Sequence, residues 1–107
     1  MSGFVHEQVD GVDVWTIVRN SAPGPALEYW LDWGSWLPPG EGIATAVWEI
    51  PAPLTLDGSV IDGTKARVWV SGAADPGQDL TGRCTVTTDG SPASSDTRSL
   101  VFRIRRR

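Results

Sequence analysis

The sequence has very little of the side-chain chemistry on which catalytic and metal sites depend. Its 107 residues contain one histidine, His6, and one cysteine, Cys84. A zinc site needs several such ligands, so the composition excludes one. His6 is the only histidine that could serve as a catalytic base, and it lies near the N-terminus, where chains are often loosely held. Cys84 has no partner for an internal disulfide, and we expect it to be a small buried residue. No catalytic residue, metal ligand or cofactor is predicted.

Long apolar runs and a surplus of positive charge are also lacking. No stretch is long enough to cross a bilayer, and no signal-peptide pattern opens the chain, so we expect it to fold in the cytoplasm of the cell that makes it. Thirteen acidic residues against nine Lys and Arg give a formal net charge of -4. This balance argues against nucleic acid or an anionic membrane as the main partner.

The charge is unevenly distributed. Residues 1–62 carry nine acids and one base, a net charge of -8, and residues 63–107 carry four acids and eight bases, a net charge of +4. One interpretation, which we favour, is that the first and last strands are neighbours and neutralise each other. The alternative is an acidic face that meets the basic face of the next copy in a head-to-tail ring.

Glycine and proline, by contrast, are plentiful, with 12 and 8 residues spread along the chain. Between them the apolar residues mostly alternate, which predicts strands and not helices. Asp10-Gly11 is typical of a tight hairpin turn. Strands are predicted over residues 4–9, 12–19, 27–33, 43–50, 54–61, 65–71 and 80–88, with a last strand that buries Leu100, Phe102 and Ile104.

This organisation predicts an all-β protein of one antiparallel sandwich. Residues 1–26 comprise an N-terminal hairpin extension and, from residue 20 to residue 25, a linker rich in proline and glycine. Residues 27–107 form the sandwich and end in a short basic tail.

Six tryptophans are the strongest signal in a chain of this size. Trp33 and Trp48 fall on faces that we expect to be buried. Trp15, Trp30 and Trp69 fall on faces that we expect to point outward, which indicates a contact surface that is covered in the working state. Alternatively, Trp30 and Trp36 form an aromatic shelf for sugar rings.

Five short motifs, in order and at compatible spacing, resemble a known family. They are Tyr-Trp-Leu-Asp-Trp-Gly-Ser-Trp-Leu (29–37), Gly-Glu-Gly-Ile-Ala (40–44), Val-Trp-Glu-Ile-Pro (47–51), Val-Trp-Val-Ser-Gly (68–72) and Thr-Arg-Ser-Leu-Val-Phe (97–102). Over residues 27–105 the chain is similar to the fiber-tail adaptor proteins of tailed phages. The family usually has an aromatic residue at the position of Leu80, so the hydrogen bond of a tyrosine corner is not expected here.

The resemblance implies an immunoglobulin-like β-sandwich and a non-enzymatic, multi-copy virion component, assembled in the bacterial cytoplasm. Its partners would be other virion proteins, at the tail tube, the portal region or a fibre, with a homo-oligomeric ring as one arrangement. Alternatives are a carbohydrate-binding module and a small head-completion or decoration protein. The residues expected to contact partners are Trp15, Trp30, Trp69, Lys65, Arg67, Arg105, Arg106 and Arg107.

Overall fold

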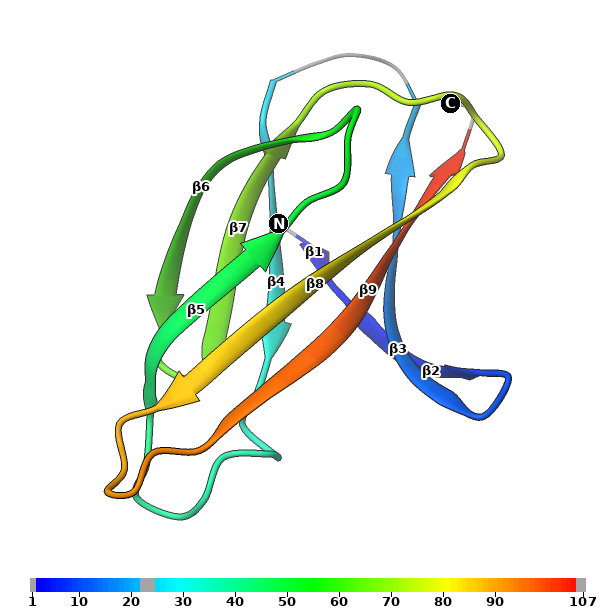
Figure 1. Ribbon diagram of the computed structural model, residues 1–107. Helices are drawn as coiled ribbons and strands as arrows, with labels where there is room; N and C mark the ends of the chain where they lie inside the picture. The colour runs from blue at the N-terminus through cyan, green and yellow to red at the C-terminus, as the bar shows by residue number, and fades with distance from the viewer. Residues whose placement is uncertain (1, 22–24, 106–107) are drawn as a thin grey trace.

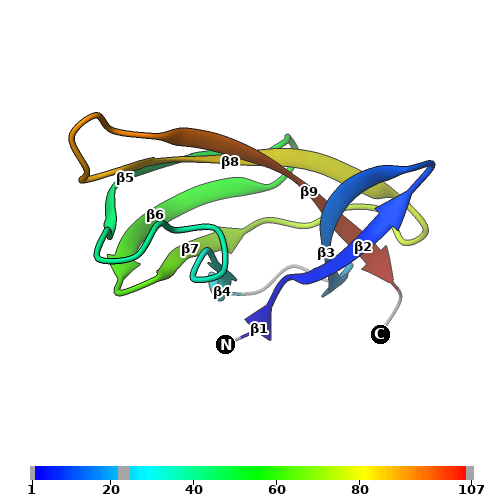
Figure 2. The same ribbon diagram turned by 90° about the horizontal axis from the view of Figure 1, so that it is seen from below.

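The computed structural model describes residues 2–21 and 25–105, which form nine strands in two layers (Figures 1 and 2). No helix, and so none long and apolar enough to cross a membrane, occurs in these residues. The predicted all-β sandwich is confirmed. The strands are β1 (Ser2–Gly3), β2 (Val5–Val9), β3 (Val12–Asn20), β4 (Leu27–Asp32), β5 (Ile43–Glu49), β6 (Thr55–Asp62), β7 (Lys65–Ser71), β8 (Asp79–Thr88) and β9 (Ser95–Arg105).

One sheet has the strand order β1-β4-β7-β6 and the other has the order β2-β3-β9-β8-β5. Most neighbouring strands are antiparallel, as predicted, and two pairs, β1–β4 and β3–β9, are parallel. Both parallel pairs join strands that are distant in sequence, and no tight turn forces such strands to run in opposite directions. The immunoglobulin-like assignment stays a prediction. The order β4-β7-β6 facing β9-β8-β5 supports it, because immunoglobulin strands B-E-D and G-F-C are arranged in this way.

The predicted N-terminal hairpin is present as β2 and β3. Val9 pairs with Val12, and the two loop residues between them, Asp10 and Gly11, have φ values of 51° and 79°. Positive φ at both positions is what a two-residue hairpin loop needs for its twist to match that of the strands. Beyond the turn, β3 pairs with the last strand, β9, from Val14 to Asn20. The division at residue 26 stays a prediction, and part of the linker, residues 22–24, lies outside the described residues.

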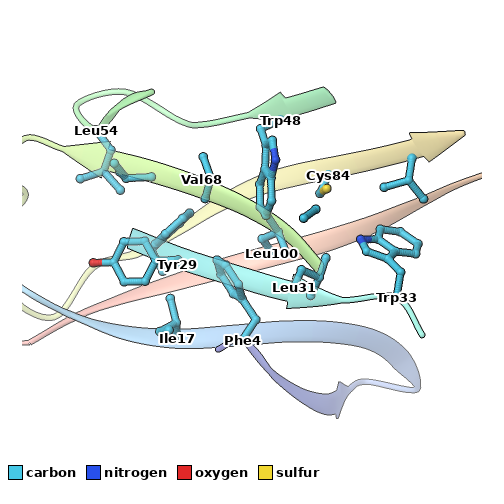
Figure 3. Close-up of a cluster of buried hydrophobic side chains, with 14 of the residues drawn as sticks. Phe4, Ile17, Tyr29, Leu31, Trp33, Trp48, Leu54, Val68, Cys84 and Leu100 are labelled. Carbon is cyan, nitrogen blue, oxygen red and sulfur yellow. The ribbon is translucent and has the colours of Figure 1, made fainter. Parts of the chain in front are cut away.

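The core lies between the sheets and follows the predicted alternation (Figure 3). Every second residue of β7, the later part of β8 and β9 is buried, and so are Trp33 and Trp48. The hairpin segment adds Phe4 and Ile17 to this core. Burial raises the pKa of the Cys84 thiol to about 12, as befits a residue packed like a small apolar side chain.

Ion pairs join the acidic and basic parts of the sequence. Arg67 contacts both Glu28, at 3.1 Å, and Asp62, at 2.6 Å. Arg83 pairs with Glu49 at 2.7 Å, and Arg103 pairs with Glu7. Each of these contacts joins an acid from residues 1–62 to a base from residues 63–107, which supports the interpretation that the two parts neutralise each other within one chain.

Candidate docking surface

The outward side of the four-stranded sheet carries four of the residues that were expected to contact partners. Because Tyr29 and Leu31 of β4 point into the core, Trp30 between them points outward, and the same alternation turns Lys65, Arg67 and Trp69 of β7 outward. We call this surface the Trp30–Trp69 face. Its residues are Glu28, Trp30, Asp32, Gly58, Val60, Asp62, Lys65, Arg67 and Trp69.

The Trp30 indole is fixed on this face by its neighbours. Gly3 of β1 lies directly beside it, and a Cβ atom added to Gly3 would overlap the six-membered ring of the indole. On the other side along the sheet, the Lys65 ammonium group lies 4.5 Å from the ring centroid, within the range of a cation–π interaction. Trp30 is therefore half-buried and held in one orientation before any partner arrives.

The positive charges of this face have partners within the chain. Arg67 lies between Glu28 and Asp62, donates a hydrogen bond to the Glu28 carboxylate and forms an ion pair with Asp62, and only 22% of its side chain is exposed. Lys65 lies over Trp30. The face thus combines two indoles and the aliphatic side chain of Val60 with charged side chains that largely neutralise one another.

Trp69 borders an open space on the edge strand. Its partner in the register on β6 is Gly58, and a Cβ atom added there would meet nothing within 4 Å. Val60, two residues further along β6, is 46% exposed. The half-buried Trp69 indole therefore lies beside a position that has no side chain, which we call the Gly58 notch.

Trp15 was expected to point outward, and this is wrong. The register pairs Trp15 with Leu100 and Ile17 with Phe102, so Trp15 shares the core side of its sheet. It is partly buried, with the His6 ring stacked on one side at 4.8 Å and the Arg98 guanidinium 4.3 Å from its ring. The error arose because β3 pairs in parallel with β9, a register that alternation within the hairpin does not reveal.

Two buried arginines were missed. Arg98 lies between Trp15 and Trp33, 3.9 Å from the Trp33 ring, and donates a hydrogen bond to the backbone oxygen of Asp32 at 2.8 Å. Burial lowers the pKa of Arg98 below its ordinary value. Arg19 donates to the Tyr29 hydroxyl at 2.6 Å and to backbone oxygens of β7 and the loop after it. The alternation of each strand could have revealed them. Arg98 lies two residues before buried Leu100, and Arg19 lies two residues after buried Ile17, so each falls on the core side of its strand.

The remaining expected residues fall elsewhere. Trp36 packs edge-on against buried Trp33 at 5.3 Å, and no ring contact joins it to Trp30 in the described residues, so these two indoles do not form one shelf. Arg105 is exposed and lies 3.5 Å from Asp79. Arg106 and Arg107 lie outside the described residues.

Few side chains suited to catalysis or metal binding occur in the described residues. His6 bonds to Asp13 at 3.0 Å on the exposed surface of the hairpin. Within residues 2–21 and 25–105, no group of three or more His, Cys, Asp or Glu side chains is placed to hold a metal ion.

The fold and this face together define a class, that of small β-sandwich proteins whose candidate site is the outward surface of a sheet. Residues 21–103, more than half of the chain, match the family described as podophage GP4 fiber-tail adaptor protein gp77. The chain belongs to this family of phage tail adaptors, as the sequence motifs suggested. No curated protein matches it.

Proposed function

We propose that the protein positions a fibre or a neighbouring tail protein in the virion of a tailed phage, and that it does so through the Trp30–Trp69 face. It works in several copies, after assembly in the host cytoplasm, and carries out no reaction. The observation that supports this most directly is a pair of half-buried indoles on a largely charge-neutralised sheet face, beside the Gly58 notch.

Such a face suits protein binding for a physical reason. A few aromatic residues near the centre of an interface commonly supply most of its binding energy. Binding also costs side-chain freedom, and Trp30 has already lost that freedom to Gly3 and Lys65. The ion pairs of Arg67 leave few unpaired charges to be stripped of water when the face is covered.

The experiment complements a phage that lacks this gene with variants and measures how much of the protein purified particles contain. Trp69→Ala is expected to reduce incorporation by at least tenfold, a loss of about 1.4 kcal/mol or more at one contact. Gly58→Leu, which fills the notch without removing any group, is expected to act in the same direction.

The matched control is Val47→Ala, which truncates an apolar residue, 60% exposed, on the outward side of the other sheet. It should be incorporated normally, and all three variants should unfold within a few degrees of the unchanged protein. Normal incorporation of both Trp69→Ala and Gly58→Leu would refute the assignment of this face.

A further inference from the structure

The edges of the two sheets differ in how well they are protected. β1 is only two residues long, and the registers of β5 and β6 are each interrupted by a bulge or irregularity, between Ile43 and Thr45 and between Leu56 and Gly58. Short strands and bulges are the usual devices that stop an edge from pairing with another chain. β2 has neither, because all five of its residues pair with β3 in unbroken register from Val5 to Val9.

The backbone groups that β2 leaves free follow from its turn. In a hairpin with a two-residue loop, the residues that flank the loop form a hydrogen-bonded pair, and such pairs then alternate along the strands. Val9–Val12, Glu7–Val14 and Val5–Thr16 are therefore the hydrogen-bonded pairs with β3. The N–H and C=O groups of His6 and Gln8 point away from β3, to the open edge.

The sequence of this edge is symmetric in character. Read in either direction, Val-His-Glu-Gln-Val is apolar, polar, acidic, polar, apolar. If two copies of β2 pair in antiparallel fashion about a two-fold axis at Glu7, His6 of each copy lies opposite Gln8 of the other. These are the residues whose backbone groups are free, so this register forms four backbone hydrogen bonds and leaves none of the free groups unpaired.

Charge is compatible with this pairing. The register places the two Glu7 residues opposite each other, where unpaired like charges would repel. Each Glu7, however, already bonds to Arg103 of its own chain. The centre of the contact would therefore hold two acids and two bases, and Val5, 64% exposed in the single chain, would lie beside it.

We propose that two copies of this chain associate through their β2 strands, joining two five-stranded sheets into one continuous sheet. A contact made by one short strand is small, so the association is weak and appears only at high protein concentration. It concerns a segment outside residues 21–103, which match the family, and it does not depend on the proposed role in the virion.

The experiment measures the concentration dependence of the molar mass of the full chain by sedimentation equilibrium. The unchanged protein should pass from monomer to dimer as its concentration rises. Gln8→Pro removes one edge donor from each copy without touching the ladder with β3, and proline is tolerated where a strand's N–H faces outward. It should weaken the dimer by about tenfold or more, since two of the four bonds are lost.

The matched control is Ser59→Pro in β6. The loop of Gly63 and Thr64 between the paired Asp62 and Lys65 also has two residues, so the same alternation turns the Ser59 N–H to the open edge of the other sheet. This variant should dimerise normally. A wild-type chain that stays monomeric at every concentration, or a Gln8→Pro variant that dimerises as well as the control, would overturn the proposal.

Two further measurements keep the proposal testable if proline unfolds the hairpin. Arg103→Gln exposes the two Glu7 charges and should weaken the dimer by roughly fivefold or more, and adding Glu7→Gln should restore it. Hydrogen exchange of the unchanged protein should slow at the His6 and Gln8 amides as concentration rises, while the Ser59 amide is unaffected. Equal exchange at low and high concentration would contradict the pairing.

Discussion

Arg19 and Arg98 lie at opposite ends of the β3–β9 pair, and each brings a buried guanidinium group into the space between the sheets. Neither takes part in an ion pair within the described residues. Arg19 is held by hydrogen bonds to the Tyr29 hydroxyl and to the backbone oxygens of Val70 and Gly72. Arg98 is held mainly by the faces of Trp15 and Trp33.

The difference shows two ways in which a buried arginine can fill the end of the space between two sheets. At the Arg19 end, three oxygen atoms accept hydrogen bonds from the arginine, so its loss removes a donor from each of them. At the Arg98 end, one backbone oxygen does so, and the indoles can pack against any long side chain of similar shape. The first end is closed by hydrogen bonds and the second by packing.

The largest expected effect comes from Trp33→Ala, which opens the Arg98 end. Trp33 is fully buried and packs against both Arg98 and Trp36. Its truncation leaves a large cavity, and we expect the free energy of unfolding to fall by about 3–5 kcal/mol. Chemical denaturation monitored by circular dichroism measures this. A loss below about 1 kcal/mol would mean that this end is not part of the core.

A direct comparison of the two ends comes next in size. Arg19→Met removes three hydrogen bonds, to the Tyr29 hydroxyl and to the backbone oxygens of Val70 and Gly72, and should cost about 1–3 kcal/mol. Arg98→Met loses its interactions with the indoles, but it relieves the burial of a charge and gains sulfur–aromatic contacts, so the net cost should stay near 1 kcal/mol or less. Denaturation of the two variants side by side measures the order. A greater cost for Arg98→Met would invert the comparison.

Much of the fold could be predicted from the sequence, because alternation alone fixes which residues of β7, β8 and β9 face the core. What alternation within one strand cannot give is the identity of a distant partner. Trp15 was misplaced for this reason, since only its pairing beside Leu100 shows that it faces inward. Alternation also does not give the depth at which a residue is buried, as Leu27 shows. It has the parity of Tyr29 and Leu31, yet at the start of β4 it lies at the margin of the opposing sheet and remains 45% exposed.

The sequence predicted which residues belong to the candidate site, but it did not predict how they are arranged. Trp30, Lys65, Arg67 and Trp69 were expected as contact residues, and the register brings them onto one face. Their separation along the chain conceals that Lys65 covers Trp30 and that Arg67 joins Glu28 to Asp62. The Gly58 notch depends on the register between β6 and β7, which is shifted by the irregularity between Leu56 and Gly58, and no local pattern encodes that shift.

The smallest expected effect concerns the outermost layer of the Arg98 end, where His6 stacks on Trp15 and bonds to Asp13. Hydrogen bonds from Gln8, and then from His6, lower the pKa of the Asp13 carboxyl. A carboxyl whose pKa is lower in the folded chain stabilises the fold above its unfolded-state pKa of about 3.9, and this contribution is lost as the pH falls through the folded value.

Asp13→Asn should therefore remove a small part of the acid sensitivity of the hairpin while leaving the β7–β9 core unchanged. Amide exchange of β2 and β3 residues, measured at a series of pH values from neutral to below 3.9, separates the two regions. In the unchanged protein, exchange corrected for its intrinsic pH dependence should accelerate in the hairpin first as the pH falls. The Asp13→Asn hairpin should lack that acceleration, because it has no carboxyl at this position to protonate. If the variant hairpin opens with the same pH dependence, the layer of His6 and Asp13 is not what holds the tip against Trp15.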